Sequence, residues 1–206
     1  MSRAATGSLN RPGGQLTGVY NLQIAVAAKR LELLHELLPG ATLFGYLVNP
    51  ANPTYTAYEA KEFESAAQTL GVRLLILNAS DPTDLEGAFA SLIRERAGAL
   101  VVGGDGLFFS HYDQVVALTA RYRVPAIFNR REATTAGGLL SYGTDYIEAW
   151  RQLGVYVGRI LKGEKPDDLP VQQVTKMQLA INLKTAKALG LTFPLSLLVR
   201  ADEVIE

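Results

Sequence analysis

Residues 43–54 read LFGYLVNPANPT, an apolar run that breaks into two Asn-Pro pairs. A continuous apolar run predicts a strand that is buried on both faces, as in a parallel sheet. We expect a helix over residues 54–70 to follow, because Gly71 supplies a common helix C-terminus. This stretch therefore predicts a strand, a loop and a helix in succession.

The same pattern recurs on both sides of this stretch. A helical spacing of apolar residues covers 22–38, and further strands are predicted at 72–77, 99–102 and 124–128. Helices are predicted between them, over 81–96 and 110–122. Strands that alternate with helices predict the α/β class with a doubly wound parallel sheet. Such sheets bind ligands at the carboxyl ends of their strands, here near Asn49, Asn78, Gly103 and Asn129.

The remainder of the chain predicts a strand at 139–142, a helix at 145–161, a strand at 172–181 and a helix at 184–189. These are too few strands for a separate domain, so we expect them to complete a sheet begun elsewhere. The predicted organisation has three parts. They are an N-terminal extension and hinge entry (1–18), a complete α/β ligand-binding lobe (19–138), and a hinge crossing with a long helix and segments of an incomplete second lobe (139–206).

Composition excludes several functions. The 20 basic and 20 acidic residues balance, which predicts no nucleic-acid partner. The chain has no cysteine, and the spacing of its two histidines, His35 and His111, fits no zinc motif, so we expect no metal and no cofactor. The N-terminus shows no pattern typical of a signal sequence, so the chain as written is expected to be cytoplasmic.

Several stretches, taken in order along the chain, resemble the tryptophan-binding-protein-like family of bacterial ABC transporter substrate-binding proteins. They are RPGG with TGV (11–14, 17–19), KRLELL (29–34), LVNPANP (47–53), LFFS (107–110), GGLLSYG (137–143), ILKGEKP with LPV (160–166, 169–171) and INLKTAKALG (181–190).

The resemblance implies a non-catalytic receptor with two α/β lobes joined by hinge strands. It also implies export to the periplasm and an ABC permease as partner. Members of this family carry roughly one hundred further residues upstream, so we expect most of the first lobe to lie outside this chain. The expected ligand is a small zwitterion, such as an aromatic or branched-chain amino acid.

The loop after the first strand is the first candidate site. Asn49, Asn52 and Thr54 offer hydrogen-bond donors beside a helix N-terminus, which suits a ligand carboxylate. The resemblance implies the same role for this loop. The alternative is a simple turn with Thr54 as N-cap.

Three further strand ends add candidates. Asp105 suits a ligand ammonium and Phe108 an apolar ligand part, although Asp105 at a helix start and Phe108 under its helix are the structural alternatives. Asn129 and Glu132 are also predicted to contact the ligand, against a solvated charge run. Tyr142 is either a ligand contact or core packing.

The hinge is predicted at Thr17, Gly18 and Gly143. The helix beyond it carries an apolar stripe that includes Trp150, which would face the missing lobe. We therefore expect a homodimer through that surface.

Two other functions compete with the receptor. A small hydrolase would need Asp105, Glu132 and His111 as an acid–base set, but nothing in the sequence orients His111, and no nucleophile-elbow, P-loop or dinucleotide motif is present. A ligand-sensing regulatory domain would share the lobe architecture but would require a DNA-binding domain elsewhere.

Overall fold

A computed structural model describes residues 9–10, 12, 15–21 and 23–206. The chain forms two compact units. The first contains the described residues up to Asn21 together with residues 144–177, and the second contains 23–143 and 178–206. The chain therefore crosses from one unit to the other at three places, after residues 22, 143 and 177.

The second unit is built on a sheet whose strands follow the order β3-β2-β4-β5-β6-β8-β9. The pairs from β3 to β6 are parallel, which confirms the predicted parallel sheet. The amide of Asn182 bonds to the carbonyl of Leu139 and that of Asp145 to Lys176, so β8 runs antiparallel to β6. The strands are β2 (Leu43–Val48), β3 (Arg73–Asn78), β4 (Ala99–Val102), β5 (Ala126–Phe128), β6 (Leu140–Thr144), β8 (Met177–Asn182) and β9 (Glu203–Ile205).

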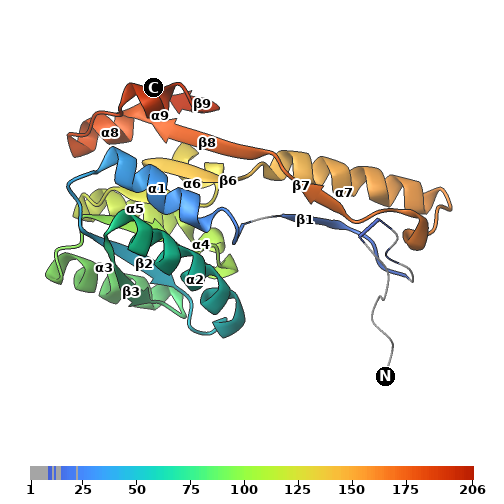
Figure 1. The fold of residues 1–206 in the computed structure, drawn as a ribbon, viewed down its shortest axis with the longest axis horizontal. Helices are drawn as coiled ribbons and strands as arrows, with labels where there is room; N and C mark the ends of the chain where they lie inside the picture. The colour runs from blue at the N-terminus through green and yellow to red at the C-terminus, as the bar shows by residue number, and fades with distance from the viewer. Residues whose placement is uncertain (1–8, 11, 13–14, 22) are drawn as a thin grey trace. The chain divides into compact units, whose positions relative to one another are not determined.

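Helices cover both faces of this sheet, as the doubly wound prediction requires (Figure 1). One core includes residues of α1 (Ala27–Leu37), α2 (Pro53–Leu70), α8 (Leu183–Leu189) and α9 (Leu195–Leu198). The other includes residues of α3 (Leu85–Arg94), α4 (Gly106–Ser110), α5 (Tyr112–Tyr122) and α6 (Arg131–Thr135). The short helix η1 (Pro82–Asp84) precedes α3.

Strand β2 explains why residues 43–48 read as a continuous apolar run. It lies inside the sheet between β3 and β4, and helices pack on both faces of the sheet, so side chains on both faces of β2 are buried. Phe44, Tyr46 and Val48 belong to the core under α1 and α2, whereas Leu47 belongs to the opposite core. The helix that follows ends at Gly71, whose φ of 68° is a left-handed conformation that favours glycine.

The first unit has a two-stranded parallel sheet of β1 (Val19–Asn21) and β7 (Gln172–Val174). It also contains α7 (Tyr146–Leu161) and η2 (Pro166–Asp168). Asp145 caps α7 by accepting hydrogen bonds from the amides of Ile147 and Glu148. The region predicted as one strand over 172–181 is therefore two strands, β7 and β8, which belong to different sheets.

Two further boundaries differ from the prediction. The helix expected from residue 22 begins at Ala27, and residue 22 itself lies outside the described residues. The helix expected over 110–122 is divided at His111, which closes α4 and precedes α5. In the described part of the chain, no helix is both long and apolar enough to cross a membrane.

Candidate functional site

Two loops at the carboxyl ends of β2 and β4 meet in the second unit. The side-chain amide of Asn49 donates to Asp105 Oδ1 over 2.8 Å, and the side-chain amide of Asn52 donates to Asp105 Oδ2 over 2.9 Å. Asn49 Oδ1 in turn accepts a hydrogen bond from the backbone amide of Ala51. Three of the predicted site residues therefore form one hydrogen-bonded cluster, which we call the Asn–Asp cluster (Asn49, Asn52 and Asp105).

Asp105 is the acceptor at the centre of this cluster and is only 8% exposed. Its carboxylate also accepts the amide of Leu107, so it caps α4. Partial burial opposes ionisation, but the bonds from Asn49, Leu107 and Asn52 outweigh it and lower the pKa of Asp105 below its usual value. Asp105 thus both caps α4 and forms the centre of the Asn–Asp cluster.

Thr54 lies in the first turn of α2 and is exposed. Asn52 occupies the N-cap position without a side-chain capping bond, and Pro53 opens the helix. The alternative in which Thr54 is the N-cap is therefore wrong, because the N-cap is Asn52, two residues earlier. The first amides of a helix have no partner within it, so this end of α2 offers donors beside the Asn–Asp cluster.

The two phenylalanines after this loop have different environments. Phe108 is 2% exposed and belongs to the core between the sheet and α5, whereas Phe109 is 37% exposed. The Arg130 guanidinium lies 3.6 Å from the centroid of the Phe109 ring, and Tyr112 stacks beside that ring. Phe108 was predicted to contact the ligand, but its side chain is almost completely buried. Phe109 is the ring that reaches the surface.

The remaining candidates lie on other elements. Asn129 follows β5 and is mostly buried, and its carbonyl accepts a bond from the side chain of Gln23. Glu132 lies in α6 and lines a shallow hollow together with Tyr112. Tyr142 is half-buried in β6 and packs against the core under α1 and α2.

The three predicted hinge residues are divided between the units. Gly143 is the last residue of the second unit before the chain crosses, and a Cβ there would lie 2.1 Å from the carbonyl oxygen of Asn129. Thr17 and Gly18 lie inside the first unit, where the Thr17 hydroxyl bonds to the carbonyl of Leu169.

A buried ion pair beneath the loops was not predicted. Arg30 of α1 is 0% exposed and Glu59 of α2 is 1% exposed, with 2.6 Å between Arg30 Nη2 and Glu59 Oε1. The Tyr46 hydroxyl donates to Glu59 Oε2, and burial together with this carboxylate raises the pKa of Tyr46. The sequence does carry a signal, because Arg30 and Glu59 occupy positions in phase with the buried residues Ala27 and Phe63.

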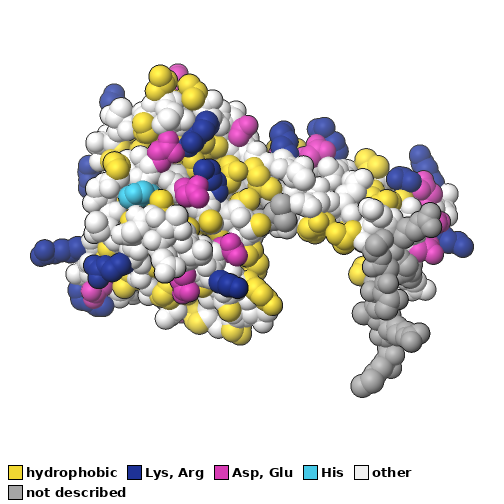
Figure 2. Space-filling model, in the orientation of Figure 1, with side chains coloured by type: hydrophobic (Ala, Val, Ile, Leu, Met, Phe, Trp, Pro, Cys, Tyr) yellow, Lys and Arg dark blue, Asp and Glu magenta, His cyan; other side chains and the backbone are white. Residues whose placement is uncertain are grey.

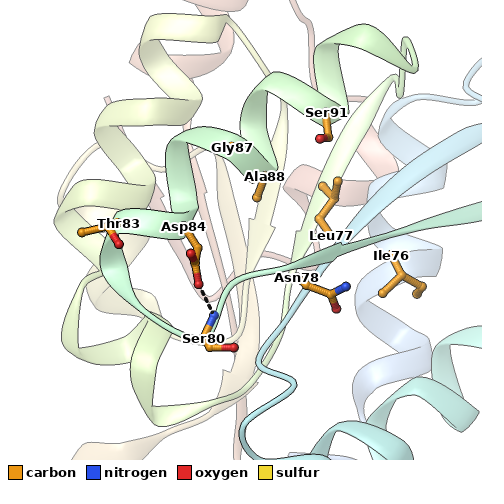
Figure 3. Close-up of a pocket in the computed structure, with 9 residues that line it drawn as sticks. All are labelled: Ile76, Leu77, Asn78, Ser80, Thr83, Asp84, Gly87, Ala88 and Ser91. Carbon is orange, nitrogen blue, oxygen red and sulfur yellow. Dashed lines mark hydrogen bonds between the residues drawn. The ribbon is translucent and has the colours of Figure 1, made fainter.

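A separate groove of about 600 Å³ lies between the edge strand β3 and α3. Asp84 points into this groove, where its carboxylate accepts the amide of Ser80 over 2.9 Å (Figure 3). Asp81 and Asp84 form a capping box around η1, so these polar groups stabilise the helix start. Within the described residues, no group of three or more His, Asp or Glu side chains could hold a metal ion.

Residues 1–205 match the family model described as "ABC transporter substrate binding protein". The chain belongs to this family of substrate-binding proteins. The assignment agrees with a parallel sheet that gathers polar side chains at the carboxyl ends of its strands.

One curated protein and two solved structures are similar to this chain. A protein of Clostridioides difficile (strain R20291) named "Tyrosine-binding protein" is 25% identical over 185 residues, which cover 89% of this chain and 52% of that protein. The structure of an ABC domain from Streptococcus pneumonia in complex with L-Trp aligns with a TM-score of 0.82 and 26% identity, covering 97% of this chain and 68% of that one. A conserved domain protein from Vibrio cholerae aligns with a TM-score of 0.83 and 25% identity, covering 96% and 65%.

This substrate-binding protein thus spans about half the length of the curated relative that it matches.

Proposed function

We propose that this substrate-binding protein captures a free amino acid with an aromatic or branched apolar side chain, without turning it over. The observation that carries the proposal is the Asn–Asp cluster beside the N-terminus of α2. Hydrogen-bond donors and one carboxylate lie together there, which suits the two charged ends of a zwitterion. Relatives whose names mention tyrosine and L-Trp support the class of ligand.

In this proposal each group has a defined role. The first turn of α2, with Asn52 and Thr54, receives the ligand carboxylate, and Asp105 receives the ammonium through its remaining acceptor capacity. Phe109, the surface ring of the pair, meets the apolar side chain in place of the buried Phe108. Asn49, Asn129, Glu132 and Tyr142 are proposed as further contacts, and Thr17, Gly18 and Gly143 as bending points of the chain.

The proposed partner is the permease of an ABC importer, to which the ligand is delivered on the outer side of the cytoplasmic membrane. Family membership supports this role and location. A receptor of this kind changes no covalent bond in its ligand, so the proposal predicts saturable binding with the ligand recovered unchanged.

We also propose that a second copy covers one face of α7. Trp150 is 64% exposed and Leu161 is 82% exposed, and Ile147 and Val157 lie on the same side of the helix. Figure 2 shows hydrophobic side chains at the surface over α7. A strip of this kind favours association in water. Light scattering should show a dimer for the natural chain and a monomer for Trp150→Glu, and a monomer for both would refute the dimer.

Calorimetric titration with free amino acids tests the binding proposal. Saturable heat is expected for aromatic or branched amino acids and none for sugars. Asp105→Asn should weaken binding, whereas Asp81→Asn, which alters an exposed aspartate at η1, should not. If both variants bind with equal affinity, Asp105 does not contact the ligand. Chromatography of the recovered ligand would reveal any turnover.

A further inference from the structure

Arg30 lies in the stretch KRLELL, which the ligand contacts proposed above leave unused. It occupies the buried side of α1, the first helix of the second unit after the chain crosses from the first. Its guanidinium donates to the carbonyl of Val102, the last residue of β4, and lies over the ring of Phe63. A charged residue in this position needs an explanation other than packing.

Stability alone does not explain the ion pair. Removing two charges from water is expensive, and apolar replacements for a buried ion pair are often neutral or stabilising. Arg30 Nε adds to the cost, because this buried atom has no hydrogen-bond partner among the residues that the structure describes. The pair is therefore expected to serve something other than the net free energy of folding.

Glu59 connects the pair to the loop that carries Asp105. Both carboxylate oxygens accept the amide of Gly104, over 3.1 Å to Oε1 and 3.0 Å to Oε2. Gly104 immediately precedes Asp105, whose carboxylate binds Asn49 and Asn52. Hydrogen bonds thus run from α1 through α2 to the loop after β4, and from there to the loop after β2.

We infer that Arg30 and Glu59 are positioning residues, which hold the Gly104 amide so that Asp105 faces the ligand in its binding conformation. The inference rests on the proposed function of the Asn–Asp cluster. Arg30 fixes the carboxylate through one nitrogen while its other terminal nitrogen is anchored on Val102. Tyr46 fixes the second oxygen. The carboxylate is thereby oriented toward Gly104 before any ligand arrives, which lowers the ordering cost of binding.

The test compares the natural chain with the double variant Arg30→Met and Glu59→Gln, which removes both charges together. The first measurement is the hydrogen-exchange rate of individual amides by NMR without ligand. The Gly104 amide should exchange at least about tenfold faster, relative to Val101 in β4, because opening of the loop no longer breaks a charge-assisted bond. The second measurement is the Kd for the amino acid bound by the natural chain, which should rise by about tenfold or more.

Two controls separate positioning from stability. Leu92→Ala lowers global stability from the opposite core, so it should not speed exchange at Gly104 relative to Val101 and should leave the Kd unchanged. Arg121→Met with Glu86→Gln removes an exposed ion pair of the same unit and should change neither measurement. The positioning role is refuted if exchange at Gly104 in the Arg30 and Glu59 double variant speeds up only as much as exchange at Val101. It is also refuted if the Kd of the double variant equals that of the natural chain. Should the natural chain bind no amino acid, the proposed function fails, and exchange at Gly104 alone decides whether the pair positions the loop.

Discussion

Asn49 and Asp105 are 56 residues apart in the chain, and the side-chain amide of one donates to the carboxylate of the other over 2.8 Å. Asn49 follows β2 and Asp105 follows β4, and these two strands are paired in the sheet. The bond therefore joins two adjacent strand-to-helix loops at the edge where α/β sheets bind their ligands.

The Asp105 carboxylate should make stability depend on pH. The pKa of Asp105 is lower in the folded protein than its ordinary value of 3.8. The ionised carboxylate therefore contributes its full stabilisation at pH values well above 3.8, and this stabilisation is lost as the pH falls through the pKa of the folded protein. Asp105→Asn should lower the free energy of unfolding by about 1–3 kcal/mol at pH 7. The substitution removes the negative charge, and the NH2 group of the new amide faces the donor of Asn49 or Asn52. Urea unfolding at pH 7 and pH 3 should show this difference shrinking in acid. A difference independent of pH would contradict the assignment.

A side chain at Gly104 should destabilise the protein. A Cβ at this position would lie 2.2 Å from the Tyr55 hydroxyl and 2.9 Å from Glu59 Oε1. Gly104→Ala should therefore cost about 1–3 kcal/mol of stability and displace the loop. Gly106→Ala is the matched control, because no atom of the described part of the chain lies within 4 Å of a Cβ there. Thermal unfolding of both variants checks the prediction, and equal melting temperatures would count against it.

The two adjacent phenylalanines should respond differently to truncation. Phe108→Ala opens a cavity in the core and should cost about 3–5 kcal/mol. Phe109→Ala removes an exposed ring under Arg130, so about 0.5–1 kcal/mol is expected from the lost cation–π contact. Chemical unfolding gives both values. If Phe109 is the ligand ring, only its variant should weaken binding while stability is nearly retained.

Asp145 should control the start of α7. Its carboxylate accepts two helix amides and pairs with Lys176 over 2.9 Å, and these bonds lower its pKa. Asp145→Ala should cost about 1 kcal/mol and loosen the first turn. Hydrogen exchange at the Ile147 and Glu148 amides reports this directly. Asp167→Ala, an exposed change in η2, provides the comparison and should leave those amides unaffected.

The central sheet could be predicted because burial leaves a direct mark on sequence. The apolar runs at β2, β3 and β4 and the glycine at the end of α2 each have a local cause. The direction of β8 could not be predicted, since a strand reads alike whether its neighbour is parallel or antiparallel. The short elements α6, α9 and β9 carry too few residues to show a period.

The candidate site was predicted only as a set of separate strand ends. Which side chains pair across them depends on loop conformation, so the bonds from Asn49 and Asn52 to Asp105 had no signature in the sequence. Phe108 and Phe109 are neighbours in a five-residue helix, and so short a helix does not reveal which ring faces the core. The ligand roles of all the predicted contacts remain predictions: Asn49, Asn52, Thr54, Asp105, Phe108, Asn129, Glu132 and Tyr142.

The strands β6 and β8 are neighbours at the place where the chain leaves the second unit and comes back. Residues 144–177 consequently have the character of an insertion between two positions that are already close in space. A short turn that joins Gly143 to Gln178 would make residues 23–143 and 178–206 one continuous chain. The loops proposed to bind the ligand, the buried ion pair and both cores lie within the residues that this shortened chain keeps, so we expect it to fold as a separate module.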